Sequence, residues 1–240
     1  MIGKELLIEI YAEEIPPFEL YRLKDFFQKE LELFLKKNDI SFLKGKMFAT
    51  PRRVTYYSKE VSEKQLDKEI VVTGPYKKIA FDKDGNPTRA LLGFLKSKNK
   101  TLEELSYQKD KKGERIFFKE FVTGVSLEKL LEKFIEKTLI LKAPFKKSMK
   151  WGENSYTFIR PIHNILATYD NIPLNISFKD LKTNNETRGH LILAPETIKI
   201  TDASKYEEIL EKQFVIADIA KRKDIILSQI KEIEENGKSR

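Results

Sequence analysis

The apolar residues change from a two-residue repeat to a three- and four-residue repeat at Pro16-Pro17. Before this point Leu6, Ile8 and Ile10 alternate with the residues between them, which is the period of a β-strand. After it the apolar residues fall on one face of a helix: Leu20, Leu23, Phe27, Leu31 and Phe34. Because Pro17 lacks an N–H group, it fits the first turn of that helix. The chain therefore begins with a strand followed by an amphipathic helix.

The middle of the chain continues with strand and helix patterns in turn. Residues 47–63 predict two β segments joined at Thr50-Pro51, and residues 68–75 predict another strand, so residues 1–75 give the order β-α-β-β-β. A helix through Leu91, Leu92 and Leu95 follows. Residues 109–122 then predict a hairpin that turns at Lys112-Gly113, and residues 126–140 predict an amphipathic helix with Ser126 as its N-cap.

The last third of the chain predicts a second hairpin, two short strands and two helices. The hairpin covers residues 162–181 and turns near Asp170-Asn171. A polar loop at 182–190 leads to the strands 191–195 and 197–200, and helices are expected at 203–214 and 217–235. The last helix could be a basic surface helix, but four isoleucines favour one that packs on the core, with Lys221, Arg222 and Lys223 exposed: Ile216, Ile219, Ile226 and Ile230.

These patterns together predict an α+β fold. Helices separate pairs of strands without a regular βαβ repeat, which favours mixed or antiparallel sheets with packed amphipathic helices. The loop at 141–155, rich in Lys and without periodicity, is the best internal boundary. We expect two or more subdomains, with approximate bounds 1–75 (β-α-β-β-β), 76–145 (helix, hairpin, helix) and 146–240 (hairpin, strand, helix).

Composition limits the classes of function. Lys and Arg number 45 against 37 Asp and Glu, a net charge of +8 that favours an anionic partner such as nucleic acid. The absence of Cys excludes disulfides, Cys-ligated metals and a Cys nucleophile, and the two His are too few for a His-only zinc site. Glu5 and Glu9 interrupt any signal peptide, and no apolar run is long enough to cross a membrane, so we expect a cytoplasmic protein without a metal or cofactor of its own.

Three short segments gather the residue types that recognise RNA. Arg guanidinium groups match phosphate oxygens, aromatic rings and His stack on unpaired bases, and Gly152 and Gly189 allow close approach of the backbone. The candidate RNA-binding residues are Arg52 and Arg53 in "TPRRV", Lys147, Lys150, Trp151, Arg160 and His163 in "KSMKWG" through "FIRPIH", and Arg188 and His190 in "NNETRGH".

Each candidate also has a structural interpretation. One of Arg52 and Arg53 could pair with a carboxylate in the strand, Trp151 could fill a gap under a loop, and both His could be hydrogen-bonded structural residues. A hydrolase is a further alternative. It would combine the two His with an acidic residue as general base and a serine as nucleophile, the acids being Asp170, Asp180 or Glu186 and the serines Ser148 or Ser155. No nucleophile elbow, P-loop or metal signature supports it, so we expect no catalytic residue in this chain.

The order of eight segments resembles a known family. "LLIEIYAEEIPP", "ATPRRV", "VTGP", "AFDKDGNPTRALLGF", "KSMKWG", "FIRPIH", "TRGH" and "VIAD" followed by "KR" are similar to the N-terminal region of the β subunit of bacterial heterotetrameric glycyl-tRNA synthetase. The resemblance covers nearly all of residues 4–230. Three positions depart from the family pattern: Lys150 stands where Arg is expected, Asn164 where Trp is frequent and Leu191 where a basic residue is common.

The resemblance implies a part in attaching glycine to tRNA. It implies an α2β2 assembly in which the α subunit uses ATP and glycine to charge tRNA-Gly, while the β subunit binds tRNA. Family β subunits are much longer than 240 residues, so the chain resembles an N-terminal piece that is not catalytic alone. Two alternatives remain: an editing-type hydrolase, as in the β subunit of phenylalanyl-tRNA synthetase, and a scaffold that binds the α subunit without contacting RNA.

Overall fold

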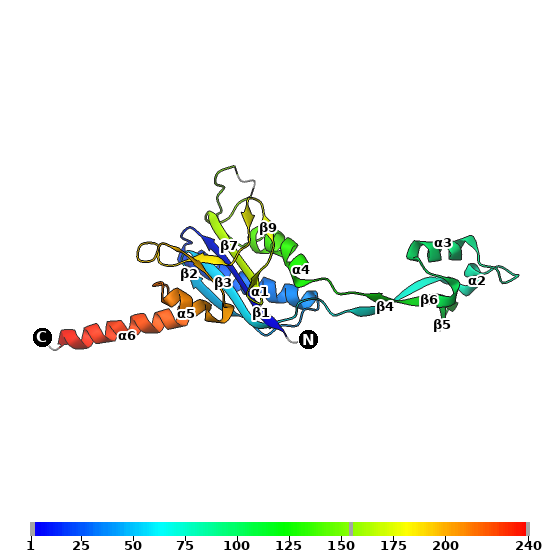
Figure 1. Ribbon diagram of the computed structural model, residues 1–240, viewed down its shortest axis with the longest axis horizontal. Helices are drawn as coiled ribbons and strands as arrows, with labels where there is room; N and C mark the ends of the chain where they lie inside the picture. The colour runs from blue at the N-terminus through cyan, green and yellow to red at the C-terminus, as the bar shows by residue number, and fades with distance from the viewer. Residues whose placement is uncertain (1–2, 154–155, 239–240) are drawn as a thin grey trace. The chain divides into compact units, whose positions relative to one another are not determined.

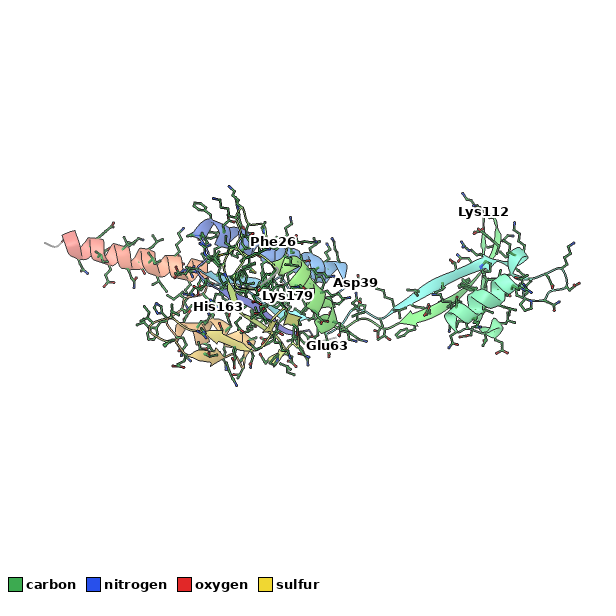
Figure 2. All side chains as sticks on the ribbon, turned by 90° about the horizontal axis from the view of Figure 1, so that it is seen from above. Phe26, Asp39, Glu63, Lys112, His163 and Lys179 are labelled. Atoms are coloured by element: carbon green, nitrogen blue, oxygen red, sulfur yellow. The ribbon has the colours of Figure 1, made fainter. Side chains whose placement is uncertain are left out.

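The computed structural model describes residues 3–153 and 156–238, whose contacts form two compact units. The first unit combines Met1–Gln65 with Val125–Arg240, and the second unit is the inserted segment Leu66–Gly124 (Figure 1). Figure 2 shows the side chains and labels Lys112 in the second unit. These two units differ from the three consecutive subdomains expected at 1–75, 76–145 and 146–240. The reason is that strands from both ends of the chain pair in one sheet, and a periodicity pattern contains no information on which strands pair.

The first unit is built on a five-stranded antiparallel sheet. Its strands, in order across the sheet, are β2 (Lys46–Thr50), β3 (Arg53–Val61), β1 (Lys4–Ala12), β7 (Ile162–Tyr169) and β8 (Ile172–Pro173). The strand–helix–strand–strand order expected for the first 61 residues is confirmed. The turn between β7 and β8 lies at Asp170-Asn171, as expected, with positive φ at both residues. Such a turn matches the twist of the strands it joins.

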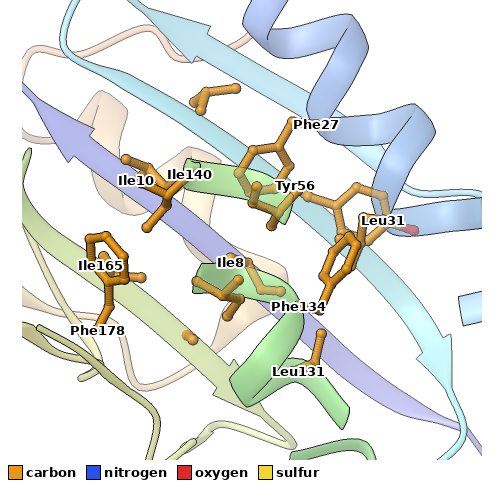
Figure 3. Packing of buried hydrophobic residues seen from close by; sticks show 14 of the residues in the cluster. Ile8, Ile10, Phe27, Leu31, Tyr56, Leu131, Phe134, Ile140, Ile165 and Phe178 are labelled. Atoms are coloured by element: carbon orange, nitrogen blue, oxygen red, sulfur yellow. The ribbon is translucent and has the colours of Figure 1, made fainter. Parts of the chain in front are cut away.

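One face of the sheet is covered by helices that carry the main core. These are α1 (Pro17–Lys37), α4 (Leu127–Phe134) and the π-helical turn η2 (Ile135–Ile140) that continues α4. Phe27 and Leu31 of α1 pack with Leu131 of α4 over Ile8 of β1, and all four side chains are fully buried (Figure 3). The apolar stripe expected after Pro17 is thus the buried face of α1. Ser126 stands at the N-cap of α4, as expected, although its side chain makes no capping hydrogen bond there.

The opposite face of the sheet has its own smaller core. A 3₁₀ turn, η3 (Ala203–Lys205), and α5 (Tyr206–Glu211) cover it, and Tyr206 and Leu210 pack against Leu7 of β1. Strand β1 is consequently buried on both faces. This burial places Glu9, a carboxylate, among fully buried side chains.

Short ribbons and one long helix complete the first unit. Their bounds are β9 (Ser177–Phe178) paired with β10 (Leu181–Lys182), β11 (Glu186–Arg188) paired with β12 (Thr197–Lys199), and α6 (Ile219–Lys238). The return strand of the second hairpin is shorter than expected, because it leaves the sheet after Pro173, which has no N–H to donate. The Thr183 side chain then accepts a hydrogen bond from Ile176 N (3.0 Å) and holds the following loop.

Three expectations for the last third are wrong. Residues 191–194 form a turn rather than a strand, because His190 O accepts a hydrogen bond from Ala194 N (2.9 Å) and closes the chain there. Helix α6 does not pack on the core beyond its first turn: Ile226 is 50% exposed and Ile230 47%. Arg222, expected on the surface, is partly buried and donates to Ala49 O (3.1 Å).

The second unit is a three-stranded antiparallel sheet with two helices. Its strands lie in the order β4 (Lys68–Tyr76), β6 (Gly113–Val122) and β5 (Ser106–Asp110), and its helical segments are α2 (Lys77–Ala80), α3 (Arg89–Lys98) and the 3₁₀ turn η1 (Leu102–Glu104). Leu91 and Leu95 of α3 pack on Ile116 of β6. The hairpin turn lies one residue before the expected place, since Asp110 pairs with Gly113.

The two units together have the expected α+β class. In the part of the chain that the structure describes, no helix combines the length and the hydrophobicity needed to cross a membrane.

Candidate nucleic-acid interface

One end of the five-stranded sheet brings several of the candidate residues together. Strand β1 ends there, β7 begins there, and the β2–β3 turn lies beside them because neighbouring strands are antiparallel. Backbone hydrogen bonds fix the segments: Ala12 N donates to Arg52 O (2.8 Å), and Glu13 N donates to Pro161 O (2.9 Å). We call Glu13, Arg52, His163 and Arg188 the strand-end surface.

Glu13 connects two of the candidates on this surface. Its carboxylate forms an ion pair with the Arg52 guanidinium and lies 2.7 Å from His163 Nε2. The hydrogen bond from His163, together with the charge of Arg52, lowers the pKa of Glu13 below its usual value. The Tyr11 ring lies beside both side chains, with its centroid 6.2 Å from that of His163 and 6.0 Å from Arg52 Cζ. Of the three groups only the His163 imidazole is well exposed (46%), since Arg52 is mostly covered and the Tyr11 ring is buried.

Arg188 is the unpaired cation of the strand-end surface. It stands at the end of β11, and its side chain is exposed with no acidic partner among residues 3–153 and 156–238. Arg188 and His163 both line a small cavity of about 120 Å³ together with Tyr11 and Asn164. An exposed guanidinium beside the exposed His163 ring can contact a phosphate while a base lies against that ring.

Arg53, in contrast, is a core residue. Only 2% of its side chain is exposed, and Arg53 Nη1 lies 3.6 Å from the Glu9 carboxylate. Its other contacts fasten β11 to the sheet: it donates to Thr187 Oγ1 (3.2 Å) and to Arg188 O (2.7 Å). Glu9 also accepts hydrogen bonds from Thr187 Oγ1 (2.5 Å) and the Tyr206 hydroxyl. Arg53 is not part of the interface, because its guanidinium is buried and both of its terminal nitrogens contact Glu9, Thr187 or Arg188 inside the protein.

The loop before β7 supplies exposed lysines and a partly buried Trp. Lys147 and Lys150 are exposed, with no acidic partner in the described part of the chain. Trp151 packs edge-on against Tyr156, with ring centroids 5.0 Å apart, and belongs to the rim of the main core. Its structural interpretation thus has direct support. Arg160 is half-buried and donates to Ile159 O (2.9 Å), and no carboxylate of the described residues neutralises it.

His190 shapes a neighbouring turn. Its Nδ1 lies 3.2 Å from both Ile192 N and Leu193 N and accepts their N–H groups. The turn leaves an exposed apolar cluster beside Arg52 and His190, around a pocket of about 460 Å³. The cluster consists of Leu191 (52% exposed), Ile192 (79%), Leu193 (61%) and Phe214 (61%).

The residues proposed for a hydrolase form no complete catalytic set in the described part of the chain: Glu186 lines the same cavity as His163, but neither His190 nor a serine does. His163 and His190 are each engaged with other groups, and Asp170 lies at the far end of β7 from His163, about 23 Å away at the rise of a strand. Asp170 pairs with Lys4 instead (2.6 Å). Ser148 is exposed, and Ser155 lies outside the described residues. The described residues also contain no cluster of three His, Asp or Glu side chains that could hold a metal ion.

Sequence reasoning missed the two carboxylates that organise this end of the sheet. In a strand with one exposed face, Glu9 would lie on the exposed side. It is buried here because a helix packs on that face of the sheet. Glu13 directly follows the last β1 residue, within three residues of Pro16. An acidic residue at a strand end beside a turn with two Arg was a signal for pairing.

A family profile described as the glycyl-tRNA synthetase beta subunit matches residues 6–240. The chain belongs to this family. It is 38% identical over 232 residues to the glycine–tRNA ligase beta subunit of Streptococcus pneumoniae strain Hungary19A-6, covering 96% of this chain and 34% of that protein. It is 37% identical over 225 residues to the Aquifex aeolicus VF5 protein of the same name, covering 93% of this chain and 33% of that protein. The resemblance carried by the eight segments is confirmed.

The chain spans about a third of the length of these relatives. The matched region contains both compact units and the whole strand-end surface. Members of this family are subunits of an aminoacyl-tRNA synthetase.

Proposed function

We propose that the chain is a tRNA-binding and assembly module of glycyl-tRNA synthetase. It supports the attachment of glycine to tRNA-Gly by an α subunit, where ATP is used, and performs no chemistry of its own. The family membership and the names of the relatives support the enzyme and its tRNA substrate. An α2β2 arrangement in the cytoplasm is part of the same proposal.

The proposed RNA binding rests on two cations near the end of the sheet, Arg188 and Arg160. Neither forms an ion pair with a carboxylate of the described residues. Arg188 is exposed and lines one cavity with the exposed His163, and Arg160 lies just before β7. Arg52 is paired with Glu13, and Glu186 in the Arg188 cavity lies 4.0 Å from Lys199, so Arg188 and Arg160 are the cations left for phosphate contacts. Phosphate contacts of this kind supply salt-dependent affinity.

The test compares three single variants for binding to tRNA-Gly. Arg188→Gln and Arg160→Gln remove the unpaired cations, whereas Arg22→Gln removes a cation that already pairs with Glu19 on α1. We expect each of the first two to weaken binding about tenfold and to reduce the slope of log Kd against log salt by about 1, with Arg22→Gln close to wild type. Unchanged affinity in both Arg188→Gln and Arg160→Gln would remove this surface from the tRNA site.

The exposed apolar cluster supports the assembly half of the proposal. Four large apolar side chains on one surface are more than isolated exposed residues require, and such patches mark protein contacts. Phe214 has φ = 61°. Because a bulky residue rarely adopts positive φ, this strained backbone is consistent with a functional constraint on the ring.

Co-elution with a glycyl-tRNA synthetase α subunit in the absence of tRNA tests this half. Ile192→Ser with Phe214→Ser removes two members of the cluster, and Leu92→Ser, on the exposed side of α3 (49% exposed), is the control. We expect the double variant alone to lose co-elution. Retained co-elution would place the α-subunit contact elsewhere on the chain.

A further inference from the structure

The second unit has a groove that the sequence did not reveal. It lies between the α2 segment with its following turn and the β5–β6 hairpin, and its volume is about 790 Å³. The unit carries 13 Lys and Arg against 9 Asp and Glu over residues 66–124, so it is basic in its own right. We call this hollow the lysine groove, after the lysines on its walls: Lys77, Lys78, Lys83 and Lys112.

Three of the four lysines have no acidic partner. Lys77 pairs with Glu114 (2.7 Å), which neutralises the carboxylate on the hairpin side. Lys78, Lys83 and Lys112 are exposed, and no acidic side chain among residues 3–153 and 156–238 pairs with them. Figure 2 labels Lys112, one of the three. The groove therefore keeps a net positive charge at its rim.

The one other acidic residue of the groove is engaged by its own turn. Asp82 Oδ1 accepts hydrogen bonds from Asn86 N (2.8 Å) and Asp84 N (3.0 Å), and Gly85 has φ = 84°. These backbone N–H bonds hold the pKa of Asp82 below its usual value. The carboxylate therefore stays charged, and it contacts the N–H groups of its own turn. The same bonds fix the loop that carries Lys83.

Aromatic rings stand between the lysines. Tyr107 is 47% exposed, and Lys77 Nζ lies 5.0 Å from its ring centroid. The Tyr76 ring is held under the Arg115 guanidinium at 5.3 Å, and its hydroxyl donates to Asp110 (3.0 Å). Phe81 adds a third ring to the wall. Rings that stack on bases, alternating with cations that contact phosphates, are what proteins use to bind single-stranded nucleic acid.

We propose that the lysine groove binds a single-stranded segment of RNA, with Tyr107 stacking on a base and Lys78, Lys83 and Lys112 contacting phosphates. The choice of RNA rests on the proposed function, but the groove belongs to the second unit, whereas the strand-end surface belongs to the first. The two sites therefore have separate variants and can fail separately.

The experiment measures binding of the 240-residue chain to a labelled, unstructured RNA of about ten nucleotides, a length within the range of such sites. Tyr107→Ala removes the exposed ring, and Phe121→Ala is its control because Phe121 is 69% exposed outside the groove. Lys83→Gln with Lys112→Gln removes two rim cations, and Lys96→Gln with Lys98→Gln removes two exposed cations of α3. Circular dichroism checks that every variant is folded.

We expect Tyr107→Ala to weaken binding about tenfold, and the Lys83/Lys112 variant to reduce the salt slope by about 1.4, as for two lost phosphate contacts to a single strand. The two controls should bind like wild type. Any one of three results would overturn the proposal: no binding by the wild-type chain at low salt, equal losses in variants and controls, or stronger competition by an acidic peptide than by RNA. One combination of results would reject the groove alone. In it, Arg160→Gln and Arg188→Gln lose tRNA binding, while the Tyr107 and Lys83/Lys112 variants bind the oligonucleotide as tightly as wild type. The proposed function would then stand without the groove.

Discussion

Gly189 occupies a position where a side chain has no room. A Cβ atom there would lie 2.8 Å from Ala194 O and 2.8 Å from Gln213 Cβ. We expect Gly189→Ala to lower the free energy of unfolding by about 1–3 kcal/mol, because the turn behind His190 must shift. Gly93 is the matched control: it lies inside α3 with open space around it, so Gly93→Ala should stabilise by about 0.5–1 kcal/mol. Denaturant unfolding of both variants measures the difference, and equal effects would contradict the packing described at Gly189.

The buried ion pair between Glu9 and Arg53 should be among the most sensitive positions of the chain. Arg53→Met leaves Glu9 without its cation in the interior, so we expect a loss of about 3–5 kcal/mol in unfolding free energy. The double variant Glu9→Gln with Arg53→Met removes both charges and should cost less than the sum of the two single variants.

Arg52→Met is the control for this pair, since the Glu13 carboxylate it would leave is 42% exposed. Its cost should stay near ~1 kcal/mol. A loss for Arg53→Met no larger than this, measured by the same unfolding curves, would mean that Arg53 is not the buried structural residue described.

The adjacent arginines show how far sequence reasoning reaches at single residues. It predicted that the pair lies at a strand break and that one of the two could pair with a carboxylate. It could not decide which, because β11 and α5, which lie far away in the sequence, bury the Arg53 side of the sheet. His163 and Arg188 were both named from residue type alone, and their meeting at one cavity follows only from the fold.

At the scale of elements, Asp218 should couple the start of α6 to the sheet. Its Oδ1 accepts hydrogen bonds from Ala220 N (2.8 Å) and Lys221 N (3.1 Å), and its carboxylate pairs with Lys46 of β2 (2.7 Å). Asp218→Ala should cost about 1 kcal/mol at pH 7, the usual effect of losing an N-cap. Asp218→Asn should cost less, because the amide oxygen can still cap the helix.

The same carboxyl group predicts a pH dependence. The hydrogen bond to Lys46 lowers the pKa of Asp218 below its ordinary value of 3.8. The stabilisation is therefore complete above about pH 4, where the group is ionised in both states, and is lost as the pH falls through the lowered pKa. Unfolding curves between pH 7 and 3 should fall less steeply for Asp218→Asn than for wild type. Asp224→Asn, an exposed position on the same helix, should follow wild type, and identical curves for all three proteins would contradict the coupling.

Local sequence patterns predicted helices, strands and turns better than they predicted which of these pack against one another. The strands at the start of the chain, the helix after Pro17 and the Asp170-Asn171 turn follow from short-range chemistry and were confirmed. The turn at 191–194 was expected as a strand from its apolar residues, and the His190 side chain that prevents this acts through hydrogen bonds that no periodicity shows. Likewise, the isoleucines of α6 suggested a core contact that the described residues do not provide.

At the scale of the whole molecule, the two-unit organisation depends on long-range pairing. Strand β1 at the start of the chain pairs with β7, so the first unit is assembled from segments on both sides of the insertion Leu66–Gly124. The sequence predicted the α+β class and the family. It contained no signal for this pairing, and therefore none for the insertion or for the lysine groove inside it.

The most direct test of the central claim is a titration of the wild-type chain with tRNA-Gly and with an unrelated tRNA, followed by fluorescence anisotropy at two salt concentrations. The account predicts binding that weakens steeply as salt rises, as phosphate contacts require, and that is tighter for tRNA-Gly. No binding to either tRNA at low salt would contradict it. The function of this region would then be assembly with the α subunit, and the cations at the end of the sheet would be surface charges without an RNA partner.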